Sequence, residues 1–249
     1  GARKLIPFTA GLQHSFNAAI SPWILDLSRQ YPAVPFGPAY WSISPVLTAA
    51  EKESSAVPIG FDDDSAYLGG IRRRLVESTF AVPSALRSVT DVESFRYATL
   101  LCLLRQRELR LISVWHPSFL TLLLDRLSSW WDDLMADVSS GECRRIPSSA
   151  VELYRALRSI PRADRAQELR LAGPSDIAAH WPHLQVVSCW GDGQAALPLL
   201  KLHERLPHVT IQAKGLLATE ACVSLPFAGH HPVAITSHFF EFEDAQRNI

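Results

Sequence analysis

The chain has 249 residues, enough to bury the core of one large domain or two modest ones. Its 24 Lys and Arg residues almost balance its 25 Asp and Glu residues, and no polybasic run occurs, so the charge indicates neither a nucleic-acid nor a membrane partner. The four cysteines are far apart and match neither a disulfide framework nor a zinc site. With no visible signal peptide and no apolar run long enough to span a bilayer, we expect a cytoplasmic protein.

The first quarter of the chain predicts one helix followed by irregular structure. Apolar residues recur at helical spacing between Thr9 and Gln30, with Thr9 as the expected N-cap and Pro22 as the expected site of a kink. From Tyr31 to Asp64, prolines recur among residues of mixed polarity. This second pattern predicts a long irregular segment over the surface.

Helical and strand-like patterns alternate through the rest of the chain. Helices are expected from Asp91 onward and at residues 116–134, 148–160, 175–181 and 193–206, and strands at residues 109–115, 184–190, 209–217, 222–226 and 232–243. Such alternation predicts an α/β domain in which helices flank a largely parallel sheet.

Two loops with polar residues or glycines directly follow strands of this predicted sheet. "WGDG" (residues 190–193) ends the strand at 184–190, and "ATEA" (residues 218–221) ends the strand at 209–217. Ligands of such sheets bind at the carboxyl ends of the strands. Because one helix and one strand separate the loops, we expect them to lie side by side.

Glu220 stands within a run of small and apolar residues. A Glu taken at random is most often a solvated turn residue. Here it follows a hydrophobic strand and Thr219, so a hydroxyl and a carboxylate meet at one strand end. That pair suits a Mg²⁺-bound phosphate, because the carboxylate is a hard oxygen ligand and the hydroxyl donates to a phosphate oxygen.

Two further groups have both a functional and a purely structural interpretation. Residues 1–4, "GARK", offer glycine flexibility and two cations for a polyphosphate, or form an exposed basic terminus. Trp115, His116 and Ser118 lie where a strand meets a helix. They line a substrate pocket, or Trp115 belongs to the core and Ser118 to a helix start.

Taken in order, six stretches resemble the auxin-responsive Gretchen Hagen family of acyl-acid amido synthetases, and its bacterial members most closely. The stretches are "GARKLIPFTAG", "PIGFDDDSAYLGG", "LRLISVWHPSFLTLLLDRL", "LQVVSCWGDGQA", "AKGLLATEACVSLP" and "AITSHFFEFE". The family is a branch of the adenylate-forming superfamily that includes firefly luciferase. The resemblance implies a luciferase-like large N-terminal adenylation domain with parallel or mixed sheets, of which residues 1–249 are the central part. The start of the phosphate loop and the C-terminal domain are then missing.

The resemblance also implies a function. Members of the family activate a carboxylic acid with ATP, forming an acyl-adenylate and pyrophosphate, and transfer the acyl group to an amine, usually that of an amino acid. We therefore expect a ligase with ATP and Mg²⁺ as cofactors and a small carboxylic acid and an amino acid as partners, inactive as this fragment alone. An acid–CoA ligase, another adenylate-forming ligase and a non-catalytic binding module of the same fold are the alternatives, and the oligomeric state stays open.

Roles are carried over from the family position by position. Catalysis is assigned to Glu220 as the Mg²⁺ ligand, to Thr219 as a phosphate contact and to Lys4 in the phosphate loop. Nucleotide binding is assigned to Arg3, Trp190, Gly191, Asp192, Ala218, Thr219 and Phe239. The plant pattern of an aromatic, a small residue, Ser, Ser and Glu is here Leu216, Leu217, Ala218, Thr219 and Glu220, so the aromatic and one hydroxyl are absent.

The acid itself is expected to bind at the junction of the strand at 109–115 and the helix that follows it. Trp115, His116, Ser118 and Phe119 are the expected substrate contacts. Their character predicts an aromatic or hydrophobic acid.

Overall fold

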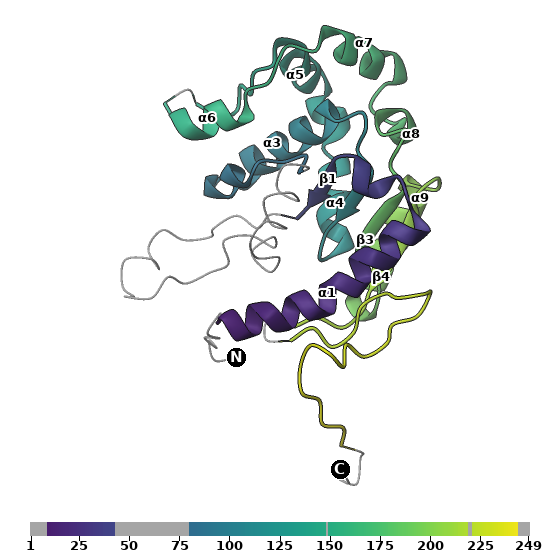
Figure 1. Cartoon of the computed structure of the whole chain (residues 1–249). Coiled ribbons are helices and arrows are strands. Elements are labelled where there is room, and N and C mark those ends of the chain that lie inside the picture. Colours follow the sequence, from purple (N-terminus) through teal and green to yellow (C-terminus); the bar gives the residue numbers. More distant parts are fainter. Residues whose placement is uncertain (1–8, 43–79, 148, 219–220, 244–249) are drawn as a thin grey trace.

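Four parallel strands form one sheet, in the order β1-β2-β3-β4, in the computed structural model of the chain (Figure 1). The strands are β1 (Ala39–Trp41), β2 (Leu111–Ser113), β3 (Val186–Trp190) and β4 (Thr210–Lys214). The structure describes residues 9–42, 80–147, 149–218 and 221–243. Helical crossovers separate successive strands, as parallel pairing requires. The predicted α/β class is therefore confirmed.

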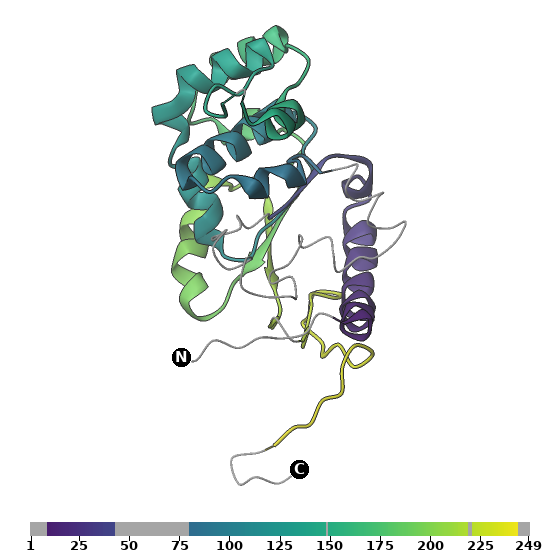
Figure 2. The same ribbon diagram turned by 90° about the vertical axis from the view of Figure 1, so that its left-hand side faces the viewer.

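The long helix α1 (Ala10–Gln30) covers one face of the sheet, as Figure 2 shows. Its buried residues Phe16, Trp23 and Leu27 pack in one cluster with Leu111 of β2 and Val186 of β3. Side chains alternate between the two faces along a strand, so the residues that follow Leu111 and Val186 point to the opposite face. α1 thus shields one set of strand side chains from water.

The remaining helices of the described chain lie on the other side of the sheet (Figures 1 and 2). Tyr40, Ile112 and Val187, one from each of β1, β2 and β3, belong to the larger core on this side. The helices are α3 (Val92–Arg105), α4 (Pro117–Leu124), α5 (Leu127–Ser140), α6 (Val151–Leu157), α7 (Ala163–Ala172), α8 (Ile177–His180) and α9 (Ala196–Arg205). Two 3₁₀ turns are η4 (Ser84–Ser88) and η5 (Gly193–Ala195), and a third, η1 (Val34–Phe36), packs through Val34 in the cluster on the α1 side. None of the helices described is both long and apolar enough to cross a membrane.

Two predicted helix starts are confirmed by their capping hydrogen bonds. The Thr9 hydroxyl accepts from the Leu12 N–H at 3.1 Å, and the Asp91 carboxylate accepts from the Ser94 N–H at 2.8 Å. Each bond satisfies a backbone donor that has no partner inside the helix. The hydrogen bonds from Ser94 also lower the pKa of Asp91.

Other boundaries differ from the sequence predictions. The single helix expected at residues 116–134 is two helices, because the Arg126 N–H donates to the Leu123 carbonyl, three residues back rather than four, without any Gly or Pro to signal the break. β1 lies within the segment expected to be irregular. α7 was not predicted, since its apolar periodicity is weak.

The strands expected at residues 222–226 and 232–243 are wrong. The described residues there form isolated antiparallel bridges between Leu217 and Cys222, Ser224 and Val233, and Phe227 and His230. Pro226 and Pro232 have no N–H to donate to a ladder. The backbone also turns sharply in the left-handed region, where Ala228 has φ 49° and Gly229 has φ 77°.

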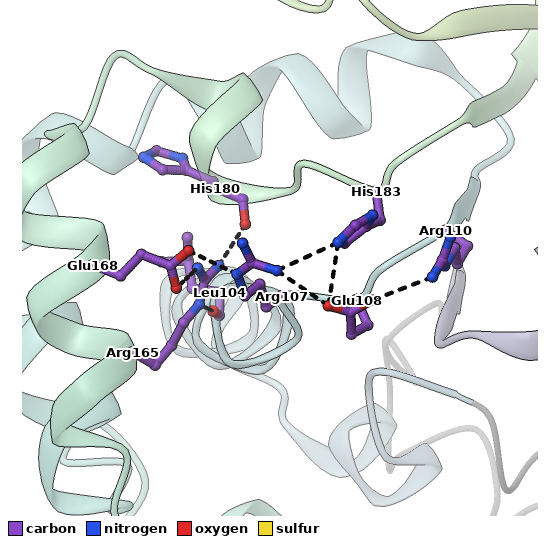
Figure 3. A network of polar contacts seen from close by, with 8 residues as sticks. All are labelled: Leu104, Arg107, Glu108, Arg110, Arg165, Glu168, His180 and His183. Carbon is purple, nitrogen blue, oxygen red and sulfur yellow. Dashed lines mark hydrogen bonds and ion pairs between the residues drawn. The ribbon is translucent and has the colours of Figure 1, made fainter.

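A buried arginine joins three helices (Figure 3). Arg165 of α7 is 1% exposed and donates to the backbone carbonyls of Leu104 in α3, at 3.0 Å, and His180 in α8. It also pairs with Glu168 at 2.7 Å, which Arg107 contacts from the surface at 2.8 Å. Burial lowers the pKa of Arg165. This residue supplies donors to carbonyls near the ends of two helices.

Candidate functional site

The carboxyl ends of β3 and β4 lie next to each other, as the sequence predicted. Trp190 pairs in register with Lys214 at the last position of both strands. The loop "WGDG" continues from Trp190, and Gly215–Ala218 continues from Lys214. The strand ends that precede the two predicted loops are therefore neighbours at one edge of the sheet, while Thr219 and Glu220 of the "ATEA" loop lie outside the described residues.

Two tryptophans and a lysine meet at this edge. The Trp190 N–H donates to the Trp115 carbonyl at 2.7 Å, and the centroids of the two rings are 5.5 Å apart. The Lys214 ammonium lies 4.9 Å from the centroid of the Trp115 ring and donates to the Ser113 hydroxyl at 2.9 Å. Lys214 is 6% exposed, so this is a largely dehydrated cation. Sequence reasoning missed it, although a lysine at the end of a predicted strand was a visible signal.

Apolar and aromatic side chains surround this lysine. A narrow cavity between α1 and the sheet is lined by Phe16, Ile20, Trp23, Trp41, Trp115, Lys214, Leu217 and Leu225. The space open to a water-sized sphere is about 20 Å³, which is room for about one water molecule. Lys214 is thus the charged group of a cavity whose other walls are apolar.

Polar side chains form a row across the same face of the sheet. Ser113 of β2, Ser188 of β3 and Gln212 of β4 are aligned in register. The Gln212 carbonyl oxygen accepts from the Trp23 indole N–H of α1 at 2.8 Å. The Ser188 hydroxyl is fully buried and has no hydrogen-bond partner among the described residues. The sheet therefore presents donors and acceptors on the face that α1 covers.

Gly191 is required by close packing of the loop after β3 on the neighbouring strand. A Cβ at this position would lie 2.8 Å from the Cβ of Ala213. Gly193, two residues on, has φ 59°, a conformation that L residues other than glycine rarely adopt. The contact with Ala213 and the positive φ explain the two glycines without a ligand.

Replacing Gly191 with Ala is expected to lower the free energy of unfolding by about 1–3 kcal/mol, because the added methyl group overpacks the contact with Ala213. Urea unfolding measures the change. Asp192→Ala is the matched control, because the Asp192 side chain is exposed and its loss is expected to cost less than about 0.5 kcal/mol. Equal effects of the two substitutions would contradict the packing argument.

The predicted acid contacts divide between the two sides of the sheet. His116 caps α4, since its Nδ1 accepts from the Ser118 N–H at 3.2 Å and lies 2.7 Å from the Ser118 hydroxyl. Phe119 packs against the larger core and stacks on Tyr40 with centroids 6.4 Å apart. Trp115 lines the cavity on the α1 side. The structure brings Trp115 to the candidate site and gives the His116–Ser118 pair a structural role as well.

The other predicted positions are placed only in part. Arg3, Lys4, Thr219 and Glu220 lie outside the described residues. The residues that flank Thr219 and Glu220 are hydrogen bonded to each other, with the Ala218 N–H donating to the Ala221 carbonyl at 2.8 Å. The Phe239 side chain is 87% exposed. Within the described ranges, no group of three or more His, Cys, Asp or Glu residues is arranged to hold a metal ion.

Burial also determines the protonation state of a thiol near the site. Cys189 of β3 is fully buried, and this burial raises its pKa to about 11, although the nearby charge of Lys214 acts to lower it. The thiol is therefore protonated at neutral pH and is a core group rather than a nucleophile.

The fold is an open parallel α/β sheet, a class in which ligands bind at the carboxyl ends of the strands. The model of the GH3 family N-terminal domain matches residues 1–211. The chain therefore belongs to the GH3 family, the Gretchen Hagen family that its motifs resemble.

Two solved structures have a similar fold. A "GH3.15 acyl acid amido synthetase" matches with a TM-score of 0.65, and "AtGH3.15 acyl acid amido synthetase in complex with 2,4-DB" with a TM-score of 0.68, each at 14% identity. Each match covers 89% of this chain but 40% of the other, so the chain spans well under half the length of these structures. A search of curated proteins found no match. The likeness to the solved structures shows the fold, and the family match shows the membership.

Proposed function

We propose that residues 1–249 are the central part of the large N-terminal domain of an ATP-dependent acyl-acid amido synthetase. The observation that carries this proposal is the family match over residues 1–211. Two findings support it: the two similar solved structures are of acyl acid amido synthetases, and the loops after β3 and β4 lie side by side at a sheet edge suited to ligands. The reaction adenylates a carboxylic acid and then passes the acyl group to the amine of an amino acid.

The nucleotide is proposed to bind at the loops after β3 and β4. Trp190, Gly191 and Asp192 line the adenine pocket in this proposal, together with Ala218 and Phe239. The position of the first three beside the end of β4 supports the assignment. Phe239, exposed in the described chain, becomes an aromatic wall if the nucleotide covers it.

Thr219 and Glu220 are proposed to serve the phosphates, with Arg3 and Lys4 as the cations of the phosphate loop. The hydrogen bond between their neighbours Ala218 and Ala221 lies shortly after the end of β4 at Lys214, which supports a place for this pair near the strand end. A single carboxylate together with phosphate oxygens and waters is a donor set typical of Mg²⁺. Bound there, Mg²⁺ supplies neutralisation of the negative charge of the phosphates. Glu220 then acts as a metal ligand rather than as a general base.

Formation of the amide tests the function directly. The full-length protein that contains this chain is incubated with ATP, Mg²⁺, a panel of carboxylic acids and a mixture of amino acids, and products are identified by mass spectrometry. We expect an acyl–amino acid amide whose formation requires ATP. A thioester formed with CoA in place of an amide would indicate the acid–CoA ligase, and binding without any product would indicate the non-catalytic module.

A further inference from the structure

A second cavity lies between α3, α6 and the segment that leads into η4 (Figure 1). Its volume is about 340 Å³, which is within the size range of cavities that bind small organic molecules. It adjoins the starts of two strands, because Phe80 in its wall bridges to Ala39, the first residue of β1, and Gln106 follows α3 in the connection to β2. The loops proposed to bind the nucleotide follow the opposite ends of parallel strands, so this cavity is separate from that site.

The walls of this cavity are apolar apart from a few hydrogen-bond donors. Val82 and Pro83 contribute apolar surface, while Arg105, Gln106 and Arg158 contribute two guanidinium groups and an amide. The Gln106 side chain is half-buried and makes no hydrogen bond with the described residues. No Asp or Glu is among the described residues that line the cavity. An apolar cavity with donors and no carboxylate is typical of a site for an organic anion.

Arg105 carries a charge that no carboxylate pairs with in the described chain. The residue is 8% exposed, and its guanidinium donates to three backbone carbonyls, among them Asp137 at 3.2 Å and Glu142 at 2.6 Å. Its Nε–H has no partner among the described residues. The side-chain carboxylates of Glu142 and Asp137 are paired instead with Arg158, at 3.4 Å, and with Arg144, at 3.0 Å. Carbonyls satisfy N–H groups but leave the positive charge uncompensated, and a bound anion would neutralise it.

We propose that this cavity binds a small organic monocarboxylate, with its charge toward Arg105 and Gln106 and its apolar part against Val82 and Pro83. One uncompensated positive charge matches one negative charge, and in a poorly hydrated place the attraction acts without direct contact. The Gln106 amide donates to the carboxylate. Apolar walls favour an acid with an apolar body over inorganic phosphate, which would lose its hydration without gaining enough partners. The site is independent of the proposed function, and its ligand is not the acid that reacts.

Binding of acids by the full-length protein that contains this chain tests the proposal. Butyrate, hexanoate and benzoate are each compared with the corresponding primary amide and with inorganic phosphate by isothermal titration calorimetry. Gln106→Glu keeps the size of the side chain but places a carboxylate beside that of the ligand. We expect it to weaken at least one acid by about 30-fold or more and its amide by less than about threefold. Gln167→Glu, the same change at an exposed position of α7, is the matched control and is expected to leave acid binding unchanged.

A second variant covers the case in which Gln106→Glu does not fold. Ala156 is an exposed residue of α6 at the cavity, so Ala156→Phe is expected to fill the space and abolish the same binding. Ala163→Phe, at an exposed position of α7 outside the cavity, is its control.

Several results would overturn the proposal. They are acid binding that neither variant at the cavity weakens, equal losses for the acid and its amide in Gln106→Glu, equal losses in a variant and its control, and tighter binding of phosphate than of any acid. Binding of no acid at all by the wild type would overturn it as well. If an acid binds at the cavity but no adenylate or amide forms, the proposed function fails and this site stands.

Discussion

Replacing Glu220 with Gln in the full-length protein is expected to lower Mg²⁺-dependent adenylation by about 10²–10³-fold. In the proposed reaction, the attack of a carboxylate on the α-phosphorus brings negative charges together, and a metal ligand at this position would keep the neutralising ion in place. Gln keeps the size of the side chain but removes its charge. Nucleotide binding is expected to fall far less, because the proposed contacts with the adenine and ribose come from other residues.

The measurement is acid-dependent exchange of labelled pyrophosphate into ATP, compared with ATP affinity from calorimetry for the same protein. Glu241→Gln is the matched control, because Glu241 is exposed in the described chain and is expected to leave both quantities unchanged. Raising the Mg²⁺ concentration is expected to restore part of the activity of Glu220→Gln. Equal losses of exchange and of ATP affinity would assign Glu220 to general affinity or folding instead.

Replacing Arg165 with Met is expected to cost about 3 kcal/mol of unfolding free energy. The side chain is buried and donates to the carbonyls of Leu104 and His180, so its loss leaves two carbonyls without these donors (Figure 3). It also leaves Glu168 without its buried partner. Met fills a similar volume, so the cost reports the lost polar contacts rather than a cavity.

Arg107→Met provides a matched control on the same carboxylate. Arg107 binds Glu168 at 2.8 Å, but its side chain is 44% exposed. An exposed ion pair contributes little to stability, so we expect Arg107→Met to cost much less than Arg165→Met. Urea unfolding of the three proteins at neutral pH measures the difference. If Arg107→Met costs as much as Arg165→Met, burial is not the reason for the stability of this network.

Local signals in the sequence predicted the fold well where the structure depends on neighbouring residues. Thr9 and Asp91 start helices because each side chain bonds to an N–H three residues later, a relation that the sequence contains in full. β2, β3 and β4 were predictable because their strand-like runs are bounded by helices, whereas β1 was missed within the proline-rich segment. The strand expected at residues 232–243 failed because an alternating pattern needs a partner strand, and the described chain provides an isolated bridge.

The candidate site was predicted only in its loops. The adjacency of the "WGDG" loop to the end of β4 follows from strand order, which chain connectivity constrains. The buried position of Lys214 could not be predicted, because its contacts are with Ser113 and the ring of Trp115, both about a hundred residues away along the chain. Phe119 is close to Trp115 in sequence but packs on the other side of the sheet, so closeness in sequence was misleading here.

Adenylation by the full-length protein is the central claim, and acid-dependent exchange of labelled pyrophosphate into ATP tests it most directly. The assay is run with Mg²⁺ over aromatic, aliphatic and hormone-like carboxylic acids. Exchange that requires one acid or a small group of related acids is the predicted result, and it identifies the substrate at the same time. No exchange with any acid, from protein whose folding is verified by circular dichroism, would contradict the claim and favour a binding module that retained the fold.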